Sequence, residues 1–120
     1  LNKTFGTEKI EIQRPDHSKE PFSLIIKNHN SLAYKSDTQG LDEIIFAHLG
    51  TQLWKRIECA MLEIYRIPEK NIDYESMNEI FKTHFSKIYS INKNSFLEFS
   101  EYVTYSNGTD GTFDDILLIK

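Results

Sequence analysis

Residues 95–120 read SFLEFSEYVTYSNGTDGTFDDILLIK, and the rest of the predicted architecture is built around this segment. Side chains from Phe96 to Tyr105 fall into two alternating sets, which is the period of a β-strand. Residues 107–111, NGTDG, supply the positive φ angles that a hairpin turn needs. Thr112–Ile119 then predicts a returning strand, and its ILLI run is typical of a strand buried on both faces. The end of the chain is therefore predicted to be an antiparallel hairpin.

The predicted hairpin is both acidic and aromatic. No Lys or Arg lies between Lys93 and Lys120. Aromatic rings carry much of the binding energy of interfaces, and surface charge governs partner choice. We therefore expect a protein partner with a basic surface to bind this hairpin, through Glu98, Glu101, Tyr102, Tyr105, Asp114 and Asp115. The alternative is that both aromatic faces are covered, one by helices and the other by the N-terminal strands.

Three short strands are predicted before residue 36. Lys9–Gln13 alternates polar and apolar residues, Phe22–Lys27 is rich in β-branched residues, and Ser31–Lys35 returns after an Asn-rich turn. Residues 1–8 are expected to form a loose tail.

Two amphipathic helices are predicted in the middle of the chain. Apolar residues recur at helical spacing from Leu41 to Tyr65, and Gly50 inside that pattern indicates a kink, a break or a close contact. A second helix begins at Asp73 or at Ser76, which has the spacing of a capping box with the Glu three residues later, and it extends to Ser90.

The element order β-β-β-α-α-β-β predicts an α+β fold. We expect one domain over residues 1–120, with an antiparallel sheet of about five strands and the two helices on one sheet face. The chain has 120 residues, 39% of them hydrophobic and 12% aromatic, which is typical of one folded domain.

Charge and cysteine content limit the function classes. The net charge is −4 and no basic stripe is present, so nucleic-acid binding is disfavoured. The single cysteine, Cys59, cannot form an intrachain disulfide, and no apolar run has the length of a membrane span. We therefore expect an intracellular, cytoplasmic protein without membrane contact. Two glycosylation motifs, at Asn2 and Asn107, are the signals that favour secretion instead.

The sequence predicts no cofactor. The histidines have no zinc-site spacing, Cys59 is predicted inside a helix as an inert packed thiol, and His48 as a packed, hydrogen-bonded side chain. The glycines form no phosphate-binding loop, and the pattern around residues 107–115 does not fit an EF-hand.

The function expected from the sequence is a non-catalytic protein-binding module. It would be a subunit of a larger complex or a small acidic inhibitor, such as an immunity protein against a basic toxin. One alternative is a metal-dependent nuclease that uses Asp114, Asp115 and a glutamate. Another is a homo-oligomer that pairs its last strand across a twofold axis, because an apolar terminal strand is a hazardous free edge.

Overall fold

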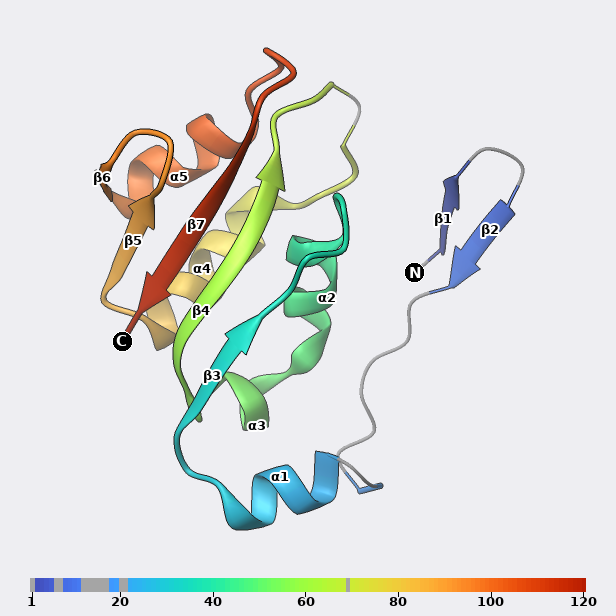
Figure 1. Cartoon of the computed structure of the whole chain (residues 1–120), viewed down its shortest axis with the longest axis vertical. Coiled ribbons are helices and arrows are strands. Elements are labelled where there is room, and N and C mark those ends of the chain that lie inside the picture. Colours follow the sequence, from blue (N-terminus) through green and yellow to red (C-terminus); the bar gives the residue numbers. More distant parts are fainter. Residues whose placement is uncertain (1, 6–7, 12–17, 20–21, 69) are drawn as a thin grey trace.

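A five-stranded sheet forms the frame of the protein (Figure 1). The computed structural model describes residues 2–5, 8–11, 18–19, 22–68 and 70–120. The strand order is β3-β4-β7-β5-β6, with bounds β3 Leu32–Lys35, β4 Ile57–Tyr65, β5 Lys87–Ser90, β6 Ser95–Leu97 and β7 Phe113–Ile119. Strands β3 and β4 are parallel and the other pairs are antiparallel, so the α+β class is confirmed but the sheet is mixed.

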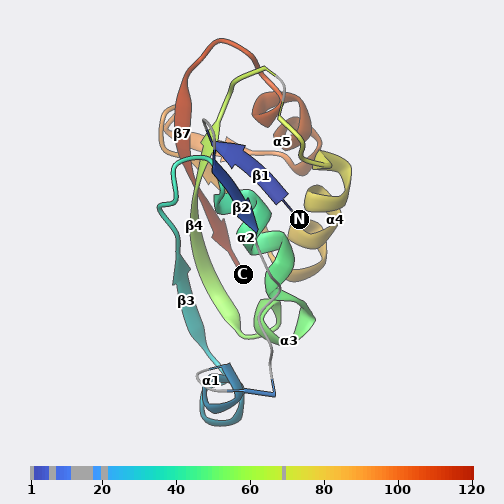
Figure 2. The same ribbon diagram turned by 90° about the vertical axis from the view of Figure 1, so that its right-hand side faces the viewer.

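The helices that pack on the sheet all lie on one of its faces (Figure 2). They are α2 Asp42–Leu49, α3 Thr51–Trp54, α4 Tyr74–His84 and α5 Phe99–Ser106. Within the described ranges, no helix lies on the opposite face (Figure 2). The same residues contain no helix that is long and apolar enough to cross a membrane.

Two strands near the N-terminus form a small sheet of their own. Strand β1, Asn2–Phe5, pairs antiparallel with β2, Glu8–Glu11. The loose tail predicted for residues 1–8 therefore contains a strand. Lys9–Gln13 was predicted as a strand and overlaps β2, and its last two residues lie outside the described part of the chain.

The N-terminal half corrects two predictions. Phe22–Lys27 was predicted as a strand but belongs to helix α1, Phe22–Asn28. The long helix predicted for 41–65 divides into α2, α3 and β4. Gly50 separates the two helices with φ 90° and ψ 166°, a conformation that interrupts any α-helix. Residues 57–65 are a strand because they pair with β3 on one side and β7 on the other.

The C-terminal half corrects two further predictions from the sequence. The second predicted helix exists as α4, and the Asp73 side chain caps it by accepting the Ser76 N–H at 3.1 Å. The helix ends at His84, not at Ser90 as predicted, and strand β5 follows. The strand predicted for residues 96–105 is mostly helix α5. Its inward residues recur at the helical spacing i, i+3, i+4, i+7, namely Phe99, Tyr102, Val103 and Ser106.

The last strand confirms the prediction that the chain returns through residues 112–119. Ile116 and Leu118 are fully buried under the helices, while Leu117 and Ile119 on the other face are only half-buried. Strand β7 lies between β4 and β5, so both of its edges are hydrogen-bonded. Twofold pairing through the last strand, considered from the sequence, therefore has no free edge to use.

The core lies between the sheet and the helices, around Phe46. The rings of Tyr34, Phe81, Phe85 and Trp54 surround the Phe46 ring at centroid distances of 5.5–6.4 Å. The Tyr34 and Phe81 rings meet Phe46 edge-on, and such aromatic contacts add to the stabilisation that burial alone gives. This packing fixes α2, α3 and α4 on the sheet and thereby positions the surfaces described next.

Candidate functional site

Two of the six residues expected to meet a partner lie inside the protein. Tyr102 has no exposed surface, and its hydroxyl donates to Glu43 at 2.6 Å. Asp114 is 1% exposed and points under the helices. A partner that docks on the surface of this conformation does not reach either side chain.

Asp114 is an internal hydrogen-bond acceptor. The Tyr105 hydroxyl donates to it at 2.7 Å, the Asn92 backbone N–H donates at 2.9 Å, and the Ser90 hydroxyl makes a third short bond. The carboxylate thus joins β7 to β5, to the following turn and to α5. Three donors from separate segments indicate a structural role, because a buried carboxylate needs such partners.

Glu98, Glu101 and Tyr105 lie on or beside helix α5 rather than on a strand. The Glu101 carboxylate accepts the Glu98 N–H at 3.1 Å and so satisfies a backbone donor at the start of the helix. Tyr105 is flanked by two cations, with the Arg66 guanidinium 4.5 Å and the Lys93 ammonium 5.1 Å from its ring centroid. The structure brings Glu101 and Tyr105 to one surface groove, but it adds two cations to surroundings that were expected to be acidic.

Asp115 lies on the opposite side of the sheet from Asp114, because side chains alternate along a strand. It belongs to the sheet face opposite the helices, which we call the open face (Figure 2). Its direct cross-strand neighbour is Glu63 on β4. Partial burial raises the pKa of Asp115, and the nearby carboxylates of Asp114, Asp37 and Asp42 raise it further. We call Glu63 and Asp115 the acidic pair.

An apolar row crosses the open face beside the acidic pair. Cross-strand pairing places Phe96 of β6 next to Tyr89 of β5, then Leu117 of β7, then Met61 of β4. The Tyr89 and Phe96 rings are 5.2 Å apart, and Phe96 is 55% exposed. Lys35 on β3 follows Met61 at the end of this apolar row.

A second aromatic contact lies at the other side of the acidic pair. Phe113 is the cross-strand partner of Tyr65, their ring centroids are 5.7 Å apart, and Phe113 is 56% exposed. Cys59 also lies on β4 and is exposed, which corrects the prediction that it packs within a helix.

The sequence contained a signal for the open face that was missed. Met61, Glu63 and Tyr65 alternate with the buried residues Leu62 and Ile64, as one face of a strand does. The same segment also matches helical spacing, so its local pattern does not distinguish a strand from a helix. Because residues 57–65 were predicted as helix, Glu63 of β4 could not be recognised from the sequence as the neighbour of Asp115.

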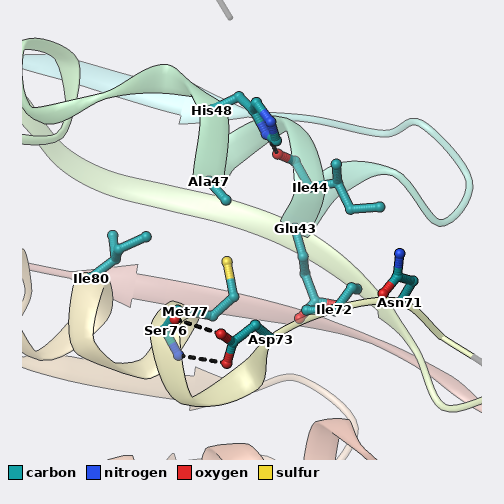
Figure 3. Close-up of a pocket in the computed structure, with 10 residues that line it drawn as sticks. All are labelled: Glu43, Ile44, Ala47, His48, Asn71, Ile72, Asp73, Ser76, Met77 and Ile80. Carbon is teal, nitrogen blue, oxygen red and sulfur yellow. Dashed lines mark hydrogen bonds between the residues drawn. The ribbon is translucent and has the colours of Figure 1, made fainter. Parts of the chain in front are cut away.

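A pocket of about 200 Å³ lies on the helical side, between α2 and α4 (Figure 3). Its lining is mostly apolar and is formed by Glu43, Ile44, Ala47, His48, Asn71, Ile72, Asp73, Ser76, Met77 and Ile80. Glu43 is 2% exposed and extends from α2 toward the α4 side of the pocket (Figure 3). Burial raises the pKa of Glu43 to about 7, although hydrogen bonds from Tyr102 and Tyr74 and the charge of Lys70 oppose the shift.

The residues beside Glu43 on α2 have structural bonds. Asp42 is fully buried and accepts the backbone N–H groups of Thr38 at 2.8 Å and Glu63 at 2.9 Å. The Nδ1 atom of His48 lies 2.7 Å from the Ile44 carbonyl oxygen, as expected for a hydrogen-bonded histidine. Glu43 differs from Asp42 and His48, because its side chain is buried and also lines the pocket.

The described residues contain no group of three or more His, Cys, Asp or Glu side chains placed to hold a metal ion. Asp114 and Asp115 point to opposite faces of the sheet, and Lys120 donates to the backbone carbonyls of Lys55 and Ile57 at 2.7 and 3.1 Å. The carboxylates that suggested a nuclease thus diverge. Comparisons with protein-family models, with curated proteins and with solved structures find no match.

Proposed function

We propose that the protein is a non-catalytic protein-binding module whose partner docks on the open face. The observation that carries this proposal is the apolar row Phe96, Tyr89, Leu117 and Met61, which runs across four strands with no helix above it in the described part of the chain. Within this row Phe96 is 55% exposed, with the Lys87 ammonium 5.2 Å from its ring centroid, and the other three side chains are half-buried. Exposed apolar patches on a protein surface mark interaction sites.

The acidic pair defines the chemistry of the partner. Glu63 and Asp115 are directly opposite each other, and like charges in this arrangement destabilise a sheet. A Lys or Arg side chain placed over the pair would relieve that repulsion. The partner is therefore expected to present apolar side chains to the apolar row and a basic side chain to the acidic pair.

This surface keeps the expected class of partner but moves the site. Asp115 is shared with the site expected from the sequence, whereas Glu98 precedes α5 and Glu101 lies on it, on the other side of the sheet. A basic partner suits the net charge of −4, which favours its approach over longer distances. A small acidic inhibitor or a subunit of a complex would both use such a surface.

Selection from a library of displayed peptides tests this chemistry. We expect enriched peptides to combine apolar residues with at least one Lys or Arg. Their binding should fall at least tenfold in the variant Phe96→Asp/Phe113→Asp and several-fold in Glu63→Gln/Asp115→Asn, because these remove the apolar and the charged contacts. The control is Leu24→Asp, since Leu24 on α1 is similarly exposed, at 46%.

Two outcomes would contradict the proposal. Enriched peptides without basic residues would show that the acidic pair does not select the partner. Peptides that bind the Phe96→Asp/Phe113→Asp variant as tightly as the wild type would place the site elsewhere. Sedimentation of the wild type alone would reveal whether a second copy of the chain occupies the open face instead.

A further inference from the structure

The pocket between α2 and α4 is separate from the open face, because the sheet lies between them (Figure 2). Its volume of about 200 Å³ is enough to hold a small organic molecule. At about 30 Å³ per water molecule, it corresponds to roughly six or seven waters. Ile44 and Ala47 form one wall, and Met77 and Ile80 form the other (Figure 3).

Glu43 is the buried carboxylate of this site, whose lining also includes Asp73 and His48, and its two oxygens are unequally bonded. Oε2 accepts the Tyr102 hydroxyl at 2.6 Å, whereas Oε1 has a long contact of 3.4 Å with the Tyr74 hydroxyl. A carboxylate oxygen can accept more than one strong hydrogen bond. Oε1 therefore retains capacity for a donor that enters through the pocket.

We propose that this pocket binds a small primary amine in its ammonium form, with the cation on Glu43 Oε1 and a compact apolar group against Ala47, Met77 and Ile80. A mostly apolar cavity with the buried carboxylate of Glu43, beside the exposed carboxylate of Asp73, matches such a ligand in both charge and polarity. The ammonium group loses hydration when it enters this site, and an ion pair with Glu43 in surroundings of low polarity offsets that loss. This site does not depend on the proposed function of the open face.

The groups around Glu43 set the pH dependence of this binding. Tyr74 of α4 and Tyr102 of α5 donate to Glu43, Lys70 approaches from the segment before α4, and Asp42 precedes it on α2. Asp73 lies at the same pocket and is occupied with the Ser76 N–H at 3.1 Å and hydroxyl at 2.7 Å (Figure 3). Because burial raises the pKa of Glu43 to about 7, the carboxylate form is scarce at pH 6 and dominant at pH 8.

The probe is isopentylamine, with isopentanol as its neutral counterpart, titrated into the whole chain and followed by NMR shifts of the Ala47 and Met77 methyl groups. A ligand this small is expected to bind with a Kd on the order of 1 mM. The amine stays protonated over the range used, so its affinity should rise about tenfold from pH 6 to pH 8 as Glu43 ionises. Isopentanol should bind more weakly and show no such rise.

Two variants make the result decisive. Glu43→Gln keeps an acceptor for Tyr102 and removes the charge, so it should abolish the pH-dependent gain of the amine over the alcohol. Ala47→Leu fills the pocket and leaves Glu43 in place, so it should weaken both probes. The proposal is overturned if the methyl signals do not move at 50-fold excess over the expected Kd. It is equally overturned if amine and alcohol bind alike at both pH values, which would indicate an apolar cavity without charge recognition.

Discussion

Burial of Glu43 couples the stability of this fold to pH. The side chain joins α2 to α4 and α5 through Tyr74 and Tyr102, at the cost of placing an ionisable group in an apolar setting. The Tyr102 contact connects residues 59 positions apart in the sequence. No local pattern could have indicated that a helix-start glutamate would meet a tyrosine so far along the chain.

We predict that Glu43→Gln removes a fall in stability that the wild type shows between pH 4.5 and 7. The pKa of Glu43 is about 7 in the folded protein and near 4.5 when exposed, so the folded state binds the proton more tightly. The free energy of unfolding should therefore fall as pH rises through that window, by up to about 3 kcal/mol. Urea unfolding at pH 5 and pH 8 measures this, and parallel curves for wild type and variant would refute it.

The neighbours Asp114 and Asp115 allow a matched comparison. Asp114→Asn places an NH₂ group among the donors of Ser90, Asn92 and Tyr105, so it should cost about 2–3 kcal/mol of stability. Asp115→Asn removes a partly buried carboxylate that lies opposite Glu63 and near Asp114, Asp37 and Asp42, and should raise stability by about 0.2–1 kcal/mol. Chemical denaturation of both variants measures these changes in the free energy of unfolding. Equal losses of stability in the two variants would mean that the two carboxylates do not differ in role.

At the scale of elements, the sequence predicted those whose signals are local. The Asp73 cap, helix α4 and strand β7 were found because a capping side chain and an apolar run can be read from a few residues. Strand β4 was missed because IECAMLEIY fits both the helical and the strand period. Pairing with β3 and β7 selects the strand, and that information lies in distant parts of the chain.

Helix α5 was missed for a related reason. Residues 95–106 carry aromatic residues that suit a strand, yet only Ser95–Leu97 pairs with β5. The Glu98 and Glu101 spacing at the helix start was the available local signal. Because the helix turns Tyr102 inward and leaves Glu101 exposed, the error in this element also misplaced the expected site.

We predict that Gly50→Ala destabilises the junction between α2 and α3. Gly50 has φ 90° and ψ 166°, a conformation that residues with a Cβ rarely adopt, and the cost is expected to be about 1–3 kcal/mol. Thr51→Ala is the control, because Thr51 is exposed at the first position of α3. Thermal unfolding of both variants measures the difference, and an unchanged Gly50→Ala melting temperature would contradict the assignment of strain to this residue.

At the scale of the whole molecule, the protein has two unlike sides. One side buries its apolar side chains between the helices and the sheet, with Glu43 and its pocket near the surface of that layer. The other side carries the apolar row and the acidic pair without a covering layer in the described residues. Charge and composition indicated a binding module, but only the strand order placed these residues side by side.

Capture from native extract tests the open face most directly. Wild type, Phe96→Asp/Phe113→Asp and Leu24→Asp would each serve as bait, after circular dichroism has shown that all three fold, and retained proteins would be quantified by mass spectrometry. We predict one stoichiometric partner with wild type and Leu24→Asp, its near-complete loss with Phe96→Asp/Phe113→Asp, and weaker retention at high salt because the acidic pair contributes. Equal retention of that partner by all three baits would contradict the open face as the binding surface.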